Sequence, residues 1–246
     1  MGRGPSIEGR KSVEDAKRAK VFTKLIREIT VATRAGVADP ADNARLRTAI
    51  EKALSANMTR DTIDRAVKRG SGADGGAEMH EMRYEGYGPA GIAFIIDCVT
   101  DNPVRTVADV RHALTKHGGN LGTSGSVAFQ FQRCGELVFD TAGDAAQEEK
   151  VLEAALDAGA DDVVNEAGES SVLCTPDSIE AMQKALAGAG LKPVRADVVM
   201  RPANRTAVPA EAQETLLDLI DWLEALDDVH DVYHNALLPA EVSSPH

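Results

Sequence analysis

The first part of the chain carries apolar residues at helical spacing. They recur at intervals of three and four, at Phe22, Leu25, Ile26, Ile29 and Ala32. This spacing predicts an amphipathic helix that buries one face. Ser12 and Asp15 precede the series and are spaced as in a capping box, so we expect the helix to begin there.

Two shorter helices are predicted next, over residues 43–56 and 59–70. Their inward positions are Leu46, Ile50 and Leu54 in the first and Ile63, Ala66 and Val67 in the second. Thr59 is the predicted N-cap of the second helix, and Gly70 its end. Together with a glycine-rich linker over residues 71–77, the three helices predict a small all-α domain of residues 1–76. Two adjacent helices also fit a helix-turn-helix, although any small bundle shows that pattern.

From residue 136 to residue 200 the pattern changes to alternating strands and helices. The order is strand, helix, strand, strand, helix, strand, which is the βαββαβ unit of ferredoxin-like folds. We therefore predict an inserted ferredoxin-like α/β domain over residues 133–202.

A second unit of the same kind is predicted from the segments on either side of the insertion. The elements before it are a strand near 92–97, a helix that starts at Asn102 and Pro103, and a strand over 127–131. The elements after it are a strand over 205–208, a helix over 209–226 and a strand over 229–236. These segments predict a split α/β domain over 79–132 plus 203–246. The predicted fold class is α+β, an N-terminal three-helix domain followed by two ferredoxin-like α/β domains, one inserted in the other.

Charge is divided unevenly along the chain. Residues 1–70 hold 16 Lys and Arg against 9 Asp and Glu, a net charge of +7. Residues 71–246 hold 11 against 30, a net charge of −19, and the whole chain has −12. Such a division predicts a basic part that faces nucleic acid, attached to an acidic body.

The cations of the first predicted helix gather on one face, which we call the basic stripe. It consists of Lys17, Lys20, Lys24, Arg27 and Arg34, and Arg10, Lys11 and Arg18 add to its charge. A stripe of this kind can follow a phosphate backbone and release counterions on binding. The alternative is an ordinary solvated helix face, since surface helices are commonly rich in Lys and Arg.

A second candidate surface for nucleic acid surrounds the next predicted helix. Its residues are Arg83, Tyr84, Tyr87, Arg105, Arg111, Lys116 and Asn120. Aromatic rings beside cations can stack on unpaired bases. The alternative is that the two tyrosines pack on the sheet and the glycines after Lys116 simply cap a helix.

Other chemistry finds little support in the sequence. Gly86, Gly88 and Gly91 match G-x-G-x-x-G, but a strand follows them, so a hairpin turn is the better interpretation. No spacing of His, Cys, Asp or Glu predicts a metal site, a cofactor or catalysis, so we expect no enzyme. The three cysteines are expected to be buried free thiols in a reducing cytoplasm. No apolar run is long enough for a membrane helix, and the first residues lack the apolar core of a signal peptide.

Several segments closely resemble the YebC/PmpR family. They are VFTKLIREI at 21–29, RYEGYGP at 83–89, TDN at 100–102, RTVADVRH at 105–112 and KHGGNLG at 116–122. The resemblance extends over essentially the whole chain, and the family includes a mitochondrial translational activator of a cytochrome oxidase subunit. One departure is clear, because the Trp and His of the family's usual N-terminal segment are missing here, whereas Arg10 and Lys11 keep its charge.

The resemblance implies an N-terminal helical domain and two α/β domains, one interrupted by the other. It also implies a cytoplasmic regulator of gene expression with no catalytic residues to transfer. Members of the family are usually regarded as DNA-binding transcriptional regulators, and others resemble ribosome-associated translation factors that relieve stalling, for example at proline-rich stretches.

Three hypotheses for the partners therefore stay open. The basic stripe binds duplex DNA, or it binds ribosomal RNA while the acidic domains face ribosomal proteins, or the chain is an adaptor that touches no nucleic acid. The −19 of residues 71–246 opposes close wrapping of a duplex. Screening over about 8 Å in physiological salt nevertheless permits a local basic contact.

Overall fold

The structure is a computed structural model that describes residues 7–73, 75 and 78–238, with side chains from residue 16 onward in the first helix. Its contacts divide the chain into two compact units. One consists of Met1–Ser124 with Glu214–Val232, and the other of Gly125–Gln213 with Tyr233–His246. The predicted division into 1–76, 79–132 plus 203–246, and 133–202 stays a prediction.

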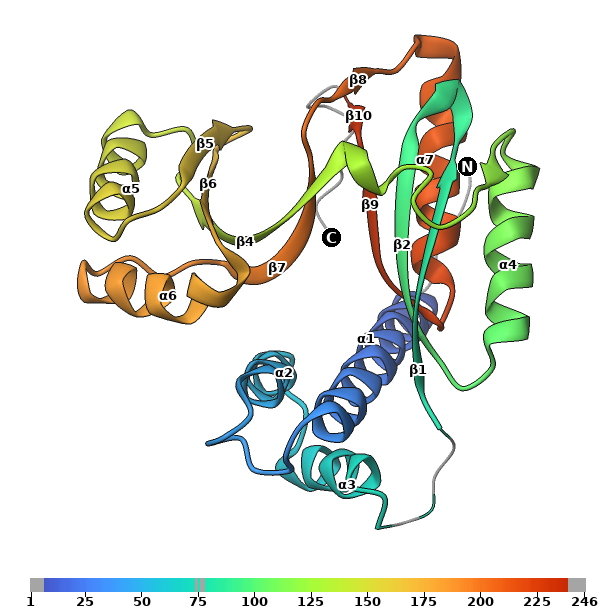
Figure 1. Ribbon diagram of the computed structural model, residues 1–246, viewed down its shortest axis with the longest axis horizontal. Coiled ribbons are helices and arrows are strands. Elements are labelled where there is room, and N and C mark those ends of the chain that lie inside the picture. Colours follow the sequence, from blue (N-terminus) through green and yellow to red (C-terminus); the bar gives the residue numbers. More distant parts are fainter. Residues whose placement is uncertain (1–6, 74, 76–77, 239–246) are drawn as a thin grey trace. The chain divides into compact units, whose positions relative to one another are not determined.

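The N-terminal part is a bundle of three helices, as predicted. They are α1 (Ile7–Ala35), α2 (Ala44–Ser55) and α3 (Arg60–Gly70) (Figure 1). The predicted start of α1 at a capping box is wrong, because Ser12 lies inside the helix, which already runs from Ile7. Pro5 is the last proline before Ser12, so no ring blocks helical hydrogen bonds between the two.

The bundle core confirms the apolar face predicted for α1. Its buried residues are Ile29, Ala32, Leu46, Ala49, Ala53, Met58, Ile63 and Ala66, with Phe22, Leu25 and Ile26 packed against them. Leu54 was expected to face inward but is 37% exposed, because the buried positions of α2 run through its neighbour Ala53. Gly70 allows a close crossing, since a Cβ there would lie 2.6 Å from the backbone oxygen of Thr30.

Side-chain caps fix the ends of the two shorter helices. The Asn43 side chain accepts a hydrogen bond from the Leu46 N–H at 3.0 Å and donates to the Ala32 carbonyl at 2.8 Å. Thr59 caps α3, as predicted, by accepting from the Thr62 N–H. Asn43 therefore holds the start of α2 against the last turn of α1.

The first sheet has four strands in the order β3-β1-β2-β9. The strands are β1 (His80–Tyr87), β2 (Ala93–Thr100), β3 (Asn120–Leu121) and β9 (Val229–His234). Two helices pack on it, α4 (Pro103–Lys116) and α7 (Ala210–Ala225). The fit is tight at two glycines of the hairpin, because Gly86 lies against Leu114 of α4 and Gly88 against Leu219 of α7.

Two segments predicted as strands of this sheet, 127–131 and 205–208, are not part of it. Residues 128–130 form a 3₁₀ turn that leads into the next strand, and Thr206–Ala207 (β8) pairs with Ala236–Leu237 (β10) outside the four-stranded sheet. β2 pairs with β1, a strand that was not among the predicted elements, although the hairpin turn at Gly86, Gly88 and Gly91 was predicted. The turn of residues 88–92 joins β1 to β2, so their pairing closes only a short loop.

The second sheet has the order β5-β6-β4-β7 and is antiparallel throughout. Its elements are β4 (Phe131–Asp140), α5 (Ala145–Asp157), β5 (Asp162–Glu166), β6 (Glu169–Cys174), α6 (Ile179–Gly188) and β7 (Arg195–Pro202). Leu137, Val172 and Leu186 are fully buried in the core between the sheet and its two helices. The chain order and the strand order are those of a ferredoxin-like unit, as predicted.

The structure also bears on what the sequence predicted for the cysteines and for membrane helices. Cys98, Cys134 and Cys174 are free and buried, and burial raises the pKa of the Cys98 thiol to about 12. Among the residues that the structure describes, none of the helices combines the length and the apolar character that crossing a membrane requires.

Candidate nucleic-acid interface

Two lysines of the basic stripe bind the C-terminal end of α7. Lys20 Nζ donates to the Ala225 carbonyl at 3.0 Å, and Lys24 Nζ donates to the Glu224 carbonyl at 2.9 Å. The last carbonyls of a helix have no partner within the helix and carry partial negative charge. Burial lowers the pKa of Lys24, while Glu224 and other nearby carboxylates act against that change. These lysines therefore cap α7.

Arg27 makes a similar contact one turn further along α1. Its Nη1 atom lies within hydrogen-bond distance of three oxygens, at 3.0 Å from the Val99 carbonyl, 2.9 Å from the Asp227 carbonyl and 2.7 Å from Asp228 Oδ1. The side chains of Arg27 and Asp228 are only 19% and 8% exposed. The charge of Arg27 is thus matched inside the protein rather than offered to a phosphate.

Asp228 also binds a residue of the second candidate surface. Arg105 donates to Asp228 Oδ2 from Nε at 3.1 Å and from Nη2 at 2.9 Å, its Nη2 also lies 3.0 Å from Oδ1, and the Thr106 hydroxyl donates to Oδ2 at 2.9 Å. Burial would raise the pKa of Asp228, but the hydrogen bonds from Arg27, Arg105 and Thr106 lower it. Asp228 therefore joins α1, α4 and the segment after α7.

A further ionic contact, between Glu28 and His230, links α1 to β9. His230 Nε2 lies 3.0 Å from Glu28 Oε2, and Lys52 Nζ lies 3.7 Å from Glu28 Oε1. Burial would raise the pKa of Glu28, but the hydrogen bond to His230 and the charges of Lys52 and His230 hold it at about 2. For His230, burial lowers the pKa, but the hydrogen bond and charge of Glu28 outweigh burial, so the net change is upward.

The pair should stabilise the fold most at mildly acidic pH. The Glu28 contribution is present above its ordinary pKa near 4.5 and is lost as pH falls towards about 2. The His230 contribution is present below its ordinary pKa near 6.5 and is lost as pH rises through its higher folded-state value. Charged groups near the pair are Lys24, Arg45, Lys52 and Asp231.

We therefore expect a coupling energy between Glu28 and His230 of about 2 kcal/mol near pH 5.5, the order of a hydrogen bond to a charged group. Urea unfolding of E28Q, H230Q and the double variant measures it in a double-mutant cycle. The coupling should shrink above neutral pH as His230 loses its proton. A coupling that stays constant from pH 5 to pH 9 would show that the histidine charge makes no contribution.

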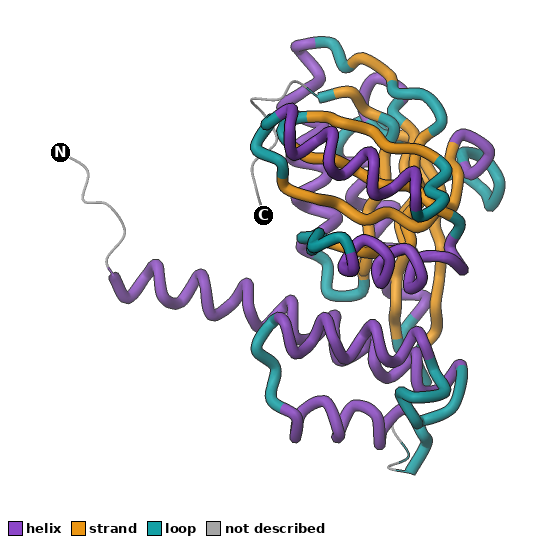
Figure 2. The backbone as a smooth tube through the Cα atoms, turned by 90° about the vertical axis from the view of Figure 1, so that its left-hand side faces the viewer, coloured by secondary structure: helices purple, strands orange, loops and turns teal. Residues whose placement is uncertain are grey.

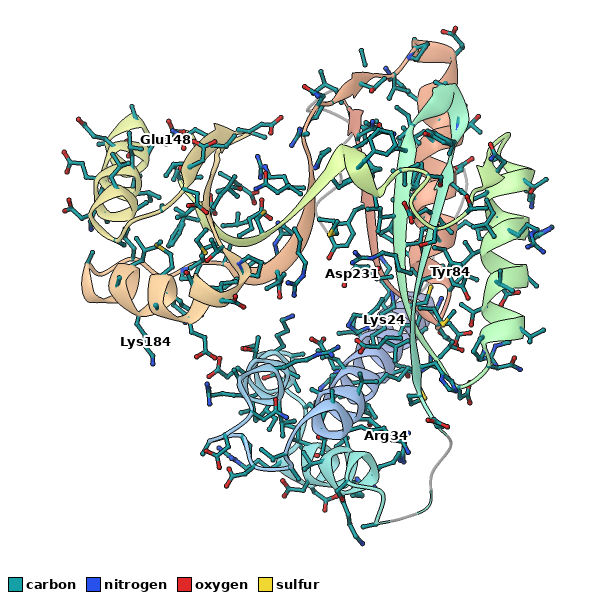
Figure 3. The ribbon with its side chains drawn as sticks, viewed as in Figure 1. Lys24, Arg34, Tyr84, Glu148, Lys184 and Asp231 are labelled. Atoms are coloured by element: carbon teal, nitrogen blue, oxygen red, sulfur yellow. The ribbon has the colours of Figure 1, made fainter. Side chains whose placement is uncertain are left out.

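The remaining cations of the basic stripe point to solvent. Lys17, Arg18 and Arg34 are exposed, and the Arg18 guanidinium lies 5.2 Å from the centre of the Phe22 ring. Figure 3 shows Lys24 near the lower ends of the strands and Arg34 near α3. Arg10 and Lys11 belong to the first turns of α1, but their side chains lie outside the described residues. The stripe and the cations beside it therefore divide into two groups. The inward cations, Lys20, Lys24 and Arg27, bind other elements of the protein, although Lys20 is itself exposed, and the outward cations, Lys17, Arg18 and Arg34, bind none in the part of the chain that the structure describes.

The second candidate surface is divided in the same way. Arg83 pairs with Asp97 of the neighbouring strand at 2.6 and 2.7 Å, so it is held within the sheet, as Arg105 is by Asp228. Tyr84 and Tyr87 are three residues apart on β1, which places them on opposite faces of the sheet rather than in one stacking platform. Arg111, Lys116 and Asn120 are exposed.

Trp222 is the residue that the sequence reasoning missed. Lys116 Nζ lies 4.0 Å from the centre of the Trp222 ring, and the rings of His112 and His117 meet it edge-on at 6.0 and 5.6 Å. It is the only tryptophan of the chain, and that rarity was the available signal.

The end of α4 is shaped by two glycines. The Gly118 N–H donates to the Thr115 carbonyl at 3.2 Å and the Gly119 N–H to the Leu114 carbonyl at 2.8 Å, the two bonds of a Schellman motif. Gly118 has a φ of 77°, which favours glycine. The chain then enters β3 directly beside Tyr87 of β1. The glycines thus cap a helix, as the alternative reading of the sequence expected.

Comparison with known proteins matches both the helical bundle and the part of the chain that contains the two sheets to one family. Residues 4–73 match the family described as "TACO1/YebC protein N-terminal domain", and residues 79–236 match "TACO1/YebC second and third domain". The chain belongs to the TACO1/YebC family. The inward and outward cations of the basic stripe fall in the first matched region, and α4, β1 and Trp222 fall in the second.

Similar proteins in the TACO1/YebC family bear names that indicate regulation. A "Probable transcriptional regulatory protein" of Xanthomonas oryzae pv. oryzae is 56% identical over 237 residues, which cover 96% of this chain and 97% of the relative. One of Acidithiobacillus ferrooxidans with the same description is 54% identical and covers 94% and 91%. Among solved structures, the crystal structure of a conserved hypothetical protein from Aquifex aeolicus is similar. Its sequence is 40% identical to this chain, and the two structures have a TM-score of 0.85, covering 94% of this chain and 95% of that one. These likenesses confirm the predicted fold class and family.

Proposed function

We propose that this TACO1/YebC protein is a cytoplasmic, nucleic-acid-binding regulator of gene expression that acts as a DNA-binding transcriptional regulator. The names of its relatives support regulation. The observation that carries nucleic-acid binding is the set of outward cations on α1. Lys17, Arg18 and Arg34 are exposed, and none has a carboxylate partner among the residues that the structure describes.

The position of the first outward cations suits a long polymer. Among the residues whose side chains the structure describes, the first apolar contact of α1 with the bundle is at Phe22, and the helix extends for more than three turns before that residue. Figure 2 shows this first half of α1 extending beyond α2 and α3. A helix that stands clear of its bundle and carries Lys17 and Arg18 can lie along a groove and contact phosphates there.

One observation favours a second function, that of a ribosome-associated translation factor that relieves stalling, for example at proline-rich stretches. Residues 71–246 carry a net charge of −19, which repels a duplex but suits basic ribosomal proteins. In that case the outward cations contact ribosomal RNA. Both functions use the same residues of α1, so substitutions there cannot separate them. The identity of the nucleic acid that the protein binds in cells does separate them.

The test is crosslinking in cells followed by sequencing of the bound DNA and RNA. It compares the wild type with K17E/R18E and with K150E/K184E, a control that makes the same charge change at exposed lysines of α5 and α6. We expect promoter DNA to be enriched by the wild type and the control but not by K17E/R18E. Recovery of ribosomal RNA without promoters would replace the first function by the second. Recovery of neither nucleic acid by the folded wild type would contradict both.

A further inference from the structure

A cluster of aromatic and basic side chains joins α4 and α7 on the surface of the first unit. Trp222 of α7 is partly exposed, and Lys116, His112 and His117 of α4 surround its ring at 4.0 to 6.0 Å. Cations and aromatic rings placed together are the usual elements of sites for single-stranded nucleic acid. Within the described residues, this cluster is where the lone tryptophan of the chain meets three side chains that can carry positive charge.

The charge around the cluster is unusual for this chain. The segment from residue 110 to residue 124 contains no Asp or Glu, although residues 71–246 hold 30 of them. Arg111, His112 and Lys116 are exposed, and no carboxylate in the described part of the chain forms an ion pair with them. Arg105 on the same helix is held by Asp228, so the second half of α4 presents the cations that the fold leaves available.

We propose that Trp222, Arg111 and Lys116 form a binding site for unpaired nucleotides. One base stacks on the indole of Trp222, and the phosphates on either side of it bind Arg111 and Lys116. This inference rests on the proposed function, because it assigns the protein a second contact with the same class of partner. It differs from that proposal in using α4 and α7 rather than α1.

The present contact of Lys116 with Trp222 does not prevent stacking. An exposed cation–π contact changes an equilibrium by only about two- to fivefold, whereas a base stacked on an aromatic ring changes binding by about five- to 150-fold. A base can therefore displace the lysine from the ring. The freed ammonium group then stands close to the phosphate of that base, where it gains a new electrostatic partner.

The charge of α7 favours an unpaired strand over a duplex. Asp218 and Asp221 are exposed in the turn of α7 that precedes Trp222. Their charge repels the continuous phosphate backbone of a duplex, which has a high charge density. A stacked base needs only one free face of the indole, and the basic half of α4 offers only a short track for phosphates. In a duplex, stacking on the neighbouring base pairs covers the face of the base on which the indole would stack, whereas an unpaired base can be splayed out.

Because the chain contains one tryptophan, its fluorescence reports on this site alone. The experiment titrates the full-length protein with a short oligouridylate, with an oligothymidylate and with a duplex DNA. We expect saturable quenching by either single strand and little by the duplex, since stacking needs no 2′-hydroxyl. The dependence of log affinity on log salt should have a slope of about −1.4, as expected for two phosphate contacts on a single strand.

Three variants decide the assignment. R111A/K116A should weaken binding of the single strand at least tenfold, and W222L, followed by anisotropy of a labelled strand, about as strongly. K150A/K184A is the matched control and should bind as the wild type does. Unfolding midpoints verify that all the variants fold. Because the arginine and the lysines are exposed, we expect their substitution to leave the midpoint unchanged.

The outcomes separate this inference from the proposed function. Normal quenching by K17E/R18E, together with loss of its cellular targets, supports both sites. Single strands that bind without changing the tryptophan emission, or that bind R111A/K116A as tightly as the wild type, overturn the α4 site and leave the α1 proposal standing. Equal quenching by the duplex overturns the preference for unpaired bases. Quenching by a peptide but by no oligonucleotide assigns the cluster to a protein partner instead.

Discussion

Replacing Asp228 with alanine is expected to lower the free energy of unfolding by about 3–5 kcal/mol, the range for breaking a buried ion pair. The carboxylate is only 8% exposed and accepts hydrogen bonds from Arg27, Arg105 and Thr106. Its loss leaves the Arg27 guanidinium without its charged partner in a largely dry contact. Urea unfolding followed by circular dichroism measures the change.

The neighbouring residue supplies a control for this variant. Asp227 is exposed and receives Arg27 through its backbone carbonyl, which alanine retains. D227A should therefore change the unfolding free energy by no more than about 0.5 kcal/mol, as surface substitutions usually do. Equal effects of D227A and D228A would mean that Asp228 does not hold α1 to the sheet.

The second large effect is expected at Gly119, where alanine should cost about 3 kcal/mol. A Cβ atom there would collide with the backbone oxygen of Tyr87 and lie 2.9 Å from the Cα atom of Gly88. Both neighbours belong to the backbone of the β1 hairpin, so they cannot move aside as a flexible side chain could. Overpacking of this kind usually costs 1–3 kcal/mol, and a rigid neighbour places the change at the upper end.

The adjacent glycine has a different reason to be glycine. A Cβ atom on Gly118 would meet nothing within 4 Å, but the residue has a φ of 77°. G118A should therefore cost only about 1 kcal/mol, the lower range for a left-handed residue with a side chain. Thermal and urea unfolding of both variants test the difference. A larger loss for G118A than for G119A would contradict the close approach of Gly119 to the backbone of Tyr87 and Gly88.

The sequence predicted well what depends on local spacing. The apolar series at Phe22 and Ile29 needs only neighbours along one helix to define a face, and Thr59 needs only the next turn to act as a cap. The inserted ferredoxin-like unit was predictable for the same reason, since its elements follow one another without interruption. Leu54 shows the limit, because a shift of one position around a helix decides between core and solvent.

Two of the errors involve partners that are distant in sequence. Thr206–Ala207 is short, and which strand it joins depends on β10 rather than on its own residues. The separation of inward from outward cations has the same cause, because Lys24 and Arg27 bind residues about two hundred positions away. Spacing on one helix places Lys17, Lys24 and Arg27 on a common face but cannot reveal that α7 ends against part of it.

The division into inward and outward cations decides which substitutions can test nucleic-acid binding. A variant at Lys24 or Arg27 removes contacts with Glu224 or Asp228, so loss of binding in that variant reflects altered packing as well as altered charge. Lys17 and Arg18 are free of such contacts within the described residues. They therefore allow charge to be changed without disturbing the junction between the bundle and the sheet.

The most direct test of the account measures binding and stability of K17E/R18E in the same buffers. Anisotropy with the nucleic acid recovered from cells gives the affinity over a range of salt concentrations. We expect the affinity to fall at least tenfold and the salt slope to decrease by about 2, one phosphate for each cation, while the urea midpoint stays that of the wild type. An affinity equal to that of the wild type at every salt concentration would contradict the claim that the outward cations of α1 bind nucleic acid.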